Sequence, residues 1–324
     1  MNFTLPRLWR TIACIALIAG SNRESTAESG VPEGFMIIEG DVLVPEDFFT
    51  RGTYATNLWL NAVIPYEFDA NVSSAQQSIA ISAMQRWESA ATVDFRPRAG
   101  EFNFIHIGND AASNYSLIGM WDLPGQPVQI NSWDEWVVAH ELAHALGFWH
   151  EQSRADRDTY VTINWDIIQP GMAFNFDIRG DQGPQGSGEY GPYDFDSIMH
   201  YGACDFSICC TPGFCPCAVP GCRTIILNPP YQGMVIGQMS HLSDWDKITM
   251  SFLYPRPDWR FVDVAATGAQ TGSFVQPYHQ FAPGYGNTPS GGTLWIQPGT
   301  YLAGGTHSIP MTIAAPLGGV VLGN

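Results

Sequence analysis

A run of histidines near the middle of the chain has the spacing of a metal site. His140, His144 and His150 follow the pattern His-Glu-x-x-His-x-x-Gly-x-x-His. The first two lie four residues apart, so on a helix their imidazoles point from one face, one turn apart. Gly147 lets the helix end, because glycine adopts the left-handed conformation without steric cost, and the chain can then bring His150 back as a third ligand. Three protein ligands leave one position for water, which is typical of a catalytic zinc site.

Glu141 directly follows the first histidine. Its carboxylate lies one step further round the same helix, where we expect it to act as general base toward a water molecule at the metal. The alternative interpretation, an amphipathic helix with surface histidines, does not explain why a glycine stands where the helix must end. Ser132–Glu135 has the composition of a capping box, which predicts the start of this helix.

A second motif, Ser-Ile-Met-His-Tyr, occupies Ser197–Tyr201, about fifty residues after the histidines. Met199 would place an apolar side chain beneath the metal. The Tyr201 phenol would bind the metal weakly or donate a hydrogen bond to an oxyanion. Taken alone, Met199 would be core filler and Tyr201 a half-buried aromatic residue. The position behind a three-histidine motif favours the functional interpretation.

The elements around these motifs alternate between strands and helices. The sequence predicts strands at Leu58–Phe68, Val93–Phe95, Phe102–Ile107, Asn114–Trp121 and Pro127–Ile130. A helix is predicted over Ser74–Ala90, capped by Ser74–Gln77, with an apolar stripe from Ile79 to Trp87 that faces the core. This alternation indicates an α/β sheet that packs against the first helix and the metal-binding helix.

The chain as a whole is acidic and rich in turn-forming residues. Its 324 residues include 14 Lys plus Arg against 31 Asp plus Glu, which gives a net charge of −17. That charge argues against nucleic-acid binding and against docking on anionic lipid. The 33 Gly and 23 Pro indicate a loop-rich fold rather than a helix bundle.

Composition also divides the chain. Residues 1–27 have the charged start, the short apolar run and the small-residue cleavage site of a signal peptide. Because the apolar run is too short to span a bilayer, we expect a secreted protein with no membrane insertion after the signal is removed. A short acidic segment, 28–50, precedes a folded domain over 51–256, and residues 257–324 are rich in Gly, Thr and Pro.

Six cysteines crowd into a loop rich in Gly and Pro. They are Cys204, Cys209, Cys210, Cys215, Cys217 and Cys222. In an exported chain, an even number of cysteines in such a loop predicts local disulfides, whose pairing the sequence does not decide. A second zinc site is the alternative, and we favour disulfides because the spacing lacks paired Cys-x-x-Cys knuckles.

Taken together, these motifs resemble those of the astacins, a family of secreted metzincin zinc endopeptidases. His140–Arg154, which reads HELAHALGFWHEQSR, and Ser197–Tyr201 carry the resemblance, which extends from near Phe49 to near Arg256 and is of a bacterial type. The resemblance implies an α+β or α/β metzincin fold. Its parts would be a twisted, mostly parallel sheet with one antiparallel edge strand, a zinc helix, a backing helix and a Met-turn C-terminal subdomain.

The resemblance also assigns roles to individual residues. One Zn²⁺ per chain would be held by His140, His144 and His150, with Tyr201 as a weak, mobile fifth ligand that stabilises the oxyanion. Glu141 would be the catalytic base, and Met199 the Met-turn residue. The family's two long-range disulfides are not expected here, since Val93 stands where one of their cysteines belongs.

A zymogen is a further implication of the resemblance. In this family an aspartate in a Phe-x-Gly-Asp-like motif blocks the zinc, and Ile38–Asp41, Ile-Glu-Gly-Asp, resembles that motif. Asp41 is then the expected zymogen switch, residues 28–50 the propeptide, and Phe49–Gly52 the region cut by an activating protease. Glu151 resembles the acid that receives the new N-terminus after this cut.

The C-terminal residues 257–324 contain two weakly related segments, Gly292–Tyr301 and Met311–Gly323, that resemble the first rungs of a parallel β-helix. The leading hypothesis for the chain is a secreted zinc endopeptidase that acts on proteins or peptides. One alternative is a catalytically silent scaffold that binds a glycan or a surface through residues 257–324; another is a zinc hydrolase of other substrates. The filled catalytic positions favour the peptidase, while the substrate and the oligomeric state stay open.

Overall fold

The computed structural model of the chain describes residues 31–45, 58–179, 191–211 and 214–323. The predicted signal peptide, residues 1–27, and the predicted maturation cut near Phe49–Gly52 lie outside these ranges.

None of the helices in the described ranges has both the length and the apolar character needed to cross a membrane.

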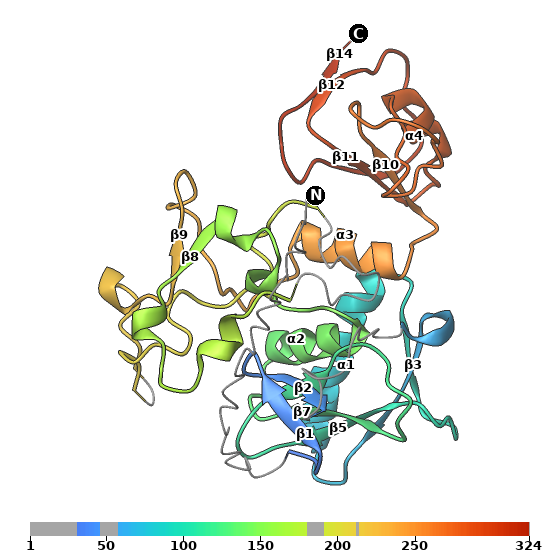
Figure 1. The fold of residues 1–324 in the computed structure, drawn as a ribbon. Coiled ribbons are helices and arrows are strands. Elements are labelled where there is room, and N and C mark those ends of the chain that lie inside the picture. Colours follow the sequence, from blue (N-terminus) through green and yellow to red (C-terminus); the bar gives the residue numbers. More distant parts are fainter. Residues whose placement is uncertain (1–30, 46–57, 180–190, 212–213, 324) are drawn as a thin grey trace, which may run out of the picture.

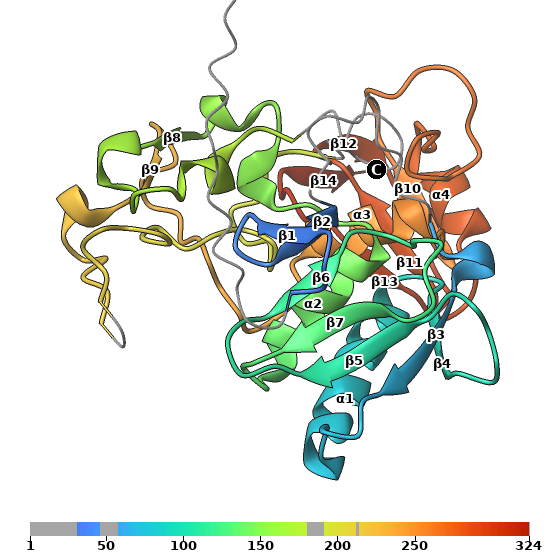
Figure 2. The same ribbon diagram turned by 60° about the horizontal axis from the view of Figure 1, so that its bottom comes forward.

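The centre of the fold is a seven-stranded mixed sheet in the order β1-β2-β6-β7-β5-β3-β4 (Figure 2). Its strands are β1 (Phe35–Ile38), β2 (Val42–Pro45), β3 (Val63–Phe68), β4 (Asp94–Pro97), β5 (Ile105–Asn109), β6 (Tyr115–Leu117) and β7 (Gln126–Ile130). Strands β4, β3, β5 and β7 are parallel to one another, whereas β6 is antiparallel to β7. The predicted mostly parallel sheet is therefore confirmed, but the antiparallel strand β6 is not at its edge, because β2 pairs with it.

Two strands from the N-terminal segment (residues 31–45) extend this sheet beyond β6. Strand β2 pairs with β6 in parallel, and β1 pairs with β2 in antiparallel fashion. Both strands bury apolar side chains. Ile38 of β1 and Val42 and Leu43 of β2 are fully buried. The N-terminal segment is thus an integrated part of the sheet and covers the strand that would otherwise be its edge.

Two long helices, α1 (Ser74–Ala90) and α2 (Glu135–Leu146), pack against each other behind the sheet (Figure 2). Both predicted caps were wrong in detail. The N-cap of α1 is Ser73, which forms a capping box with Gln76, one residue earlier than predicted. The N-cap of α2 is Asp134, whose side chain accepts a hydrogen bond from the Trp136 amide. Aspartate caps as well as serine and stands directly before the helix, so no Ser132 box forms.

Three of the predicted strands, Leu58–Phe68, Phe102–Ile107 and Asn114–Trp121, are shorter in the structure, whereas β4 and β7 are each one residue longer than predicted. Leu60–Ala62 forms a 3-10 turn in which Asn61 and Ala62 have positive φ, so β3 begins only at Val63. A strand cannot continue through left-handed residues, because their carbonyl groups point away from the ladder. The apolar pattern of the sequence therefore located the strands, whereas local backbone conformation set their ends.

The core between α1, α2 and the sheet includes Trp87, which is fully buried. Its indole Nε1 donates a hydrogen bond to the Ala139 carbonyl of α2 at 2.8 Å, next to the first metal-site histidine. Because the Trp87 side chain fills the core and connects α1 to α2, it stabilises the position of the helix that carries His140 and His144.

Replacing Trp87 by alanine is expected to lower the free energy of unfolding by about 3–5 kcal/mol, because a large buried side chain leaves a cavity. Denaturant titration of the purified chain measures this change. Ile81→Ala on the exposed side of the same helix is the matched control, with an expected change of about 0.5 kcal/mol or less. Equal effects of the two substitutions would contradict the role given to Trp87.

Beyond α2 the chain forms a subdomain with little regular structure, shown in green and yellow in Figure 1. It contains the antiparallel pair β8 (Val161–Ile163) and β9 (Ile225–Leu227), and it ends at α3 (Asp244–Leu253). Besides the 3-10 turn Leu60–Ala62 described above, the structure has 3-10 turns in this subdomain at Glu151–Ser153, Arg157–Thr159, Trp165–Ile167, Ala173–Phe176 and Pro220–Cys222. This subdomain supplies one wall of the site.

All six cysteines of the loop 204–222 are joined by three local disulfides. The pairs are Cys204–Cys217, Cys209–Cys222 and Cys210–Cys215. The prediction of a local disulfide knot is therefore confirmed. The sulfurs of Cys204, Cys215 and Cys217 lie close enough to hold a metal. Because all three are paired in disulfides, the structure favours covalent cross-links over a second zinc site.

The C-terminal module (residues 257–323) consists of short strands that pair in parallel. These are β10 (Trp259–Val262), β11 (Thr293–Ile296), β12 (Gly299–Leu302), β13 (Thr312–Ala314) and β14 (Val320–Gly323), with the helix α4 (Phe281–Asn287) beside them. Strands β10, β11 and β13 form one parallel sheet, and β12 pairs with β14 in parallel. This is the pairing that the predicted β-helix rungs require.

The C-terminal module packs onto α3 and stands apart from the central sheet (Figure 1). An aromatic cluster connects the module to α3. In it, Trp245 of α3 packs with Trp259 and Trp295 of the module. All three side chains are buried. The module is therefore attached to α3 through a packed apolar contact.

Candidate metal centre

The zinc-binding pattern predicted from the sequence comes together at the end of α2. His140 and His144 project from the last two turns of this helix, which ends at Gly147 with φ of 119°. This positive φ is one that glycine adopts readily, and the Gly147 amide donates to the carbonyls of Ala143 and His144. The chain then turns back and brings His150 beside the other two imidazoles. The geometry is the one that the spacing predicted.

Three imidazoles and one carboxylate converge on a single point. The Nε2 atoms of His140 and His150 lie 3.2 Å apart. The Asp41 carboxylate lies 3.2 Å from each of these two atoms and 3.5 Å from Nε2 of His144. Nitrogens bound to one tetrahedral zinc at ordinary distances are about 3.3 Å apart. The four side chains therefore have the spacing of a metal's coordination sphere.

The other ring nitrogens of the three histidines have partners that orient the imidazoles. Nδ1 of His140 lies 2.8 Å from the Ile198 carbonyl, and Nδ1 of His144 lies 2.8 Å from the Phe148 carbonyl. With Nδ1 protonated and donating to these carbonyls, the lone pair of Nε2 faces the convergence point. Metal-binding histidines commonly have such a partner.

Unsatisfied polar atoms show that the residues at this point fit a metal ion. Within the described ranges, the buried atoms Oδ1 of Asp41, Nε2 of His144 and Oε2 of Glu141 have no hydrogen-bond partner. Buried polar atoms normally have partners, because leaving them unpaired costs about 1–3 kcal/mol. Imidazole nitrogen and carboxylate oxygen are ligands that zinc accepts, so one zinc ion fits this donor set.

The electrostatics of the two carboxylates at the centre differ. Burial would raise the pKa of Asp41, but the neighbouring histidines, His150 foremost, hold it well below its ordinary value. Burial raises the pKa of Glu141 well above its ordinary value, and the negative charge of Asp41 raises it further. The pKa values of the two carboxyls in this site are thus shifted in opposite directions.

Met199 and Tyr201 lie on the turn beneath the histidines. Met199 is buried in the main core, and its carbonyl accepts a hydrogen bond from the Glu151 amide at 3.0 Å. The Tyr201 ring lies 4.7 Å from that of His150, centre to centre. Its hydroxyl donates to the carbonyl of Glu39 in the N-terminal segment. The role of Tyr201 as a metal ligand stays a prediction.

Asp246 fixes the position of this turn, and no sequence pattern pointed to it. Its buried carboxylate accepts hydrogen bonds from Oγ of Ser197 at 2.6 Å and from the Ile198 amide at 3.0 Å. The Ile198 carbonyl in turn orients His140. An aspartate near the start of a helix is typical of a cap, so this connection becomes visible only when α3 is placed in space.

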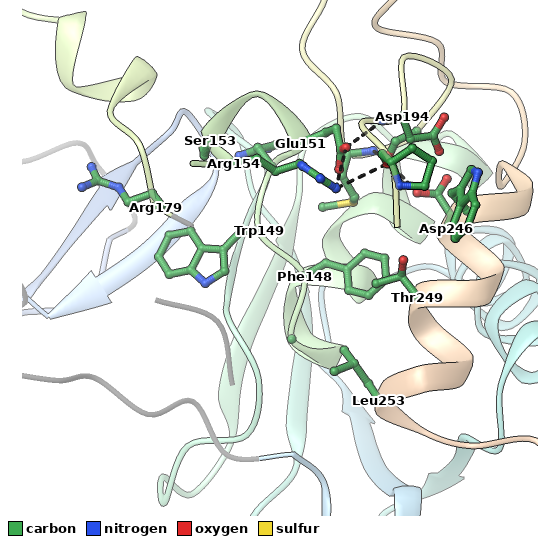
Figure 3. A pocket seen from close by; sticks show the side chains of 16 residues that line it. Phe148, Trp149, Glu151, Ser153, Arg154, Arg179, Asp194, Asp246, Thr249 and Leu253 are labelled. Atoms are coloured by element: carbon green, nitrogen blue, oxygen red, sulfur yellow. Dashed lines mark hydrogen bonds and ion pairs between the residues drawn. The ribbon is translucent and has the colours of Figure 1, made fainter. Parts of the chain in front are cut away.

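Next to the metal centre lies a cavity of about 60 Å³ whose charged lining residues include Glu151, Asp194 and Asp246 as well as Arg154 and Arg179 (Figure 3). Oε1 of Glu151 accepts a hydrogen bond from the Asp194 amide at 2.8 Å and lies 3.3 Å from Nη1 of Arg154. Asp246 of α3 faces the same cavity. Burial raises the pKa of Glu151 to about 8. The predicted acceptor of the new N-terminus thus lines a cavity, where it faces the Arg154 guanidinium.

Asp194 is expected to make the folded chain less stable as the pH rises. Burial and the nearby Asp246 raise its pKa to about 7, whereas the unfolded value is about 4. Between these values the folded state binds more protons than the unfolded state, so the free energy of unfolding falls as pH rises through this window. In Asp194→Asn this contribution is expected to vanish.

Denaturant titrations near pH 5 and near pH 7.5 test this expectation. The loss of stability between the two conditions should be smaller in Asp194→Asn than in the parent chain, since asparagine does not titrate but can still accept the Ser243 hydrogen bond. The charge of Asp194 also raises the pKa of Glu151, so its removal reduces the pH dependence of stability through that group in the same direction. An identical pH dependence of the two proteins would rule out the effect.

A second acid of the N-terminal segment, Glu39, was also missed as a site residue. Its side chain is fully buried, with Oε2 at 2.8 Å from Nδ1 of His150 and Oε1 at 3.2 Å from Nε of Arg179. Only its place beside Gly40 and Asp41 could have drawn attention to it. Arg179 lies 29 residues after the last histidine of the motif, so the sequence offered no reason to connect the two.

Comparison with known proteins agrees with this geometry. The family model described as Astacin, a peptidase family, matches residues 52–255. High choriolytic enzyme 1 of Oryzias latipes is 32% identical over 228 residues, which cover 68% of this chain and 78% of the relative. Meprin A subunit beta of Mus musculus is 34% identical over 194 residues, or 59% of this chain and 25% of the relative. The chain thus matches a quarter of the meprin subunit's length.

The fold agrees as well. A solved structure of high choriolytic enzyme 1, described as a hatching enzyme zinc-protease from Oryzias latipes, superposes with a TM-score of 0.52. That similarity, at 32% identity, covers 62% of this chain and 94% of the other. The part of the chain beyond residue 255 lies outside the family match.

Proposed function

The chain belongs to the astacin family of peptidases, and from this premise we propose that it is a zinc metalloendopeptidase that cleaves peptide bonds within proteins or peptides. The observation that carries the proposal is the convergence of three histidines at the end of α2 with Glu141 beside them. Zinc is the metal on which this family depends. When bound, it lowers the pKa of a water molecule toward about 7 and polarises the scissile carbonyl.

The residues of the chain would divide the remaining work. Glu141 takes a proton from the attacking water, whose oxygen adds to the carbonyl carbon, and later passes that proton to the leaving amine as the C–N bond breaks. Tyr201 would donate a hydrogen bond from its hydroxyl to the developing oxyanion once that hydroxyl is released from Glu39. Met199 would form the apolar floor of the site.

We also propose that the chain is made as a secreted zymogen. Asp41 would occupy the metal's open position, which its distances to the three histidines support. An activating protease would cut near Phe49–Gly52, and the new N-terminus would then enter the cavity beside Glu151. The six disulfide-bonded cysteines suit an oxidising compartment outside the cell. Residues 1–27 would be the signal peptide, 28–50 the propeptide, 51–256 the peptidase domain and 257–324 a separate module.

Metal removal tests the proposed activity. Chain that has been cut near Phe49 should hydrolyse casein, lose this activity on treatment with a chelator, and regain it when zinc is added back. Uncut chain should have at most a low activity under each of these conditions. Casein hydrolysis that persists after complete removal of zinc would contradict the proposal.

A further inference from the structure

The third histidine of the metal centre differs from the other two in the origin of its orienting partner. His140 and His144 are each oriented by a backbone carbonyl of the peptidase domain. His150 is oriented by the Glu39 carboxylate, at 2.8 Å from Nδ1. Glu39 belongs to the N-terminal segment, which would be separated from the domain on maturation. The orienting partner of His150 thus comes from the N-terminal segment, which maturation would remove.

Glu39 is held firmly enough to act as an orienting group. Its side chain is fully buried, and its second carboxylate oxygen lies 3.2 Å from Nε of Arg179. Arg179 is itself anchored, because its amide donates to the Ser153 carbonyl at 2.6 Å and Nη2 donates to the Phe174 carbonyl at 3.3 Å. The buried Glu39 carboxylate therefore has a buried, anchored guanidinium as its partner on the side away from His150.

The chemistry of imidazole links this contact to the metal. A neutral histidine carries one N–H and one lone pair, so the partner of Nδ1 decides whether Nε2 can bind a metal. A carboxylate that accepts from Nδ1 keeps the lone pair on Nε2, fixes the ring plane and makes Nε2 more basic. In His150 that Nε2 atom points at the convergence point, 3.2 Å from the Asp41 carboxylate.

We propose that Glu39 is a positioning residue of the zinc site in the uncut chain, and that the uncut chain therefore holds zinc more tightly than the matured one. This inference rests on the proposed function, in particular on zinc as the metal and on removal of the N-terminal segment. The segment would then contribute twice, through the direct ligand Asp41 and through the orienting carboxylate Glu39.

The docking of the N-terminal segment does not depend on these two acids alone. Strand β2 pairs with β6, and Ile38, Val42 and Leu43 are fully buried. Substitutions at Glu39 and Asp41 therefore leave the apolar and backbone contacts of the segment in place. This makes it possible to vary the two carboxylates separately.

The test measures zinc affinity by competition with a chromophoric chelator. The full, uncut chain carries Glu141→Ala so that it does not cut itself, and Glu39→Ala is added with Asp41 intact and with Asp41→Ala. We expect Glu39→Ala to weaken zinc binding about 10–100-fold in both backgrounds. Glu33→Ala is the matched control, because this residue has the same charge in the same segment but is exposed, and its zinc affinity should not change.

Two further samples separate the orientation of His150 from the docking of the N-terminal segment. In Glu39→Gln the amide oxygen still accepts from Nδ1 of His150, so most of the zinc affinity should return. The chain cut near Phe49 and freed of its segment should bind zinc more weakly than the uncut chain.

Several results would overturn the inference. An unchanged zinc affinity in Glu39→Ala would do so, as would a loss of zinc affinity that occurs only when Asp41 is intact. So would a Glu39→Gln variant that binds zinc as weakly as Glu39→Ala. Cut chain that binds zinc as tightly as uncut chain would also overturn it. If the parent chain bound no zinc at all, the proposed function itself would fail, which distinguishes the two outcomes.

Discussion

Glu141→Ala in zinc-loaded, matured chain is expected to lower kcat by about 10²–10⁴-fold, the usual contribution of a positioned general base. The side chain is almost fully buried beside the histidines, and burial raises its pKa well above the ordinary value. A carboxylate with this environment is a stronger proton acceptor than one in water. Steady-state cleavage of a quenched fluorescent peptide measures the change.

The controls for this variant separate chemistry from metal binding. Glu141 is not one of the four residues that converge on the metal, so zinc content of the alanine variant should equal that of the parent. Glu141→Gln keeps the shape of the side chain but not its basicity and should lose about as much activity. A glutamine variant that retains most of kcat would show that the base is another group.

Asp41→Ala is expected to raise the peptidase activity of the uncut chain by about 10–100-fold. The parent carboxylate, which is 21% exposed, lies 3.2–3.5 Å from the three Nε2 atoms, and a hydrogen bond to a charged group contributes about 1.5–3 kcal/mol. Removing it opens the position that water and substrate need. Strand β2 still covers β6 in this variant, so the activity should stay below that of the cut chain.

Mass spectrometry must show that the variant remains uncut during the assay. Glu33→Ala in the uncut chain is the matched control and should leave it inactive, because that acid is exposed and is not among the residues that converge on the metal. Uncut Asp41→Ala that is as inactive as the uncut parent, while its cut form is fully active, would show that the strands and not the aspartate block the site.

The parts of the site that could be predicted from the sequence are those set by local geometry. The spacing of His140 and His144 fixes their common face on a helix, and Gly147 fixes where that helix ends. The family resemblance added Asp41, which the structure places 3.2–3.5 Å from the three Nε2 atoms. A few neighbouring residues determine the two helix features, whereas the contact of Asp41 with His140 spans 99 residues and was predicted only through the family resemblance.

The parts that escaped prediction depend on long-range contacts. Glu39 reaches His150 across 111 residues and Arg179 across 140, and Asp246 reaches the Met199 turn across 48 or 49. Periodicity and capping patterns report on neighbours within a turn or two, so they contain no information on such partners. The same limit applies to Trp245, whose role in attaching the C-terminal module follows from the position of α3.

The strand ends and helix caps were mispredicted for a different reason. Serine, threonine and aspartate are all good N-caps, so a run such as Ser132–Glu135 offers several starts of similar free energy. Tertiary packing then selects among them, and in α2 the selected residue is Asp134. The position of a helix is therefore better determined by its apolar stripe than by its first residue.

The most direct test of the central claim is cleavage of a peptide blocked at both ends, carried out in ¹⁸O-enriched water with chain cut near Phe49. A zinc endopeptidase should cleave an internal bond and leave ¹⁸O in the new carboxylate. The reaction should stop on chelation, return with zinc, and be lost in Glu141→Ala. Zinc-loaded, matured chain that leaves every blocked peptide of a diverse library intact would contradict the claim.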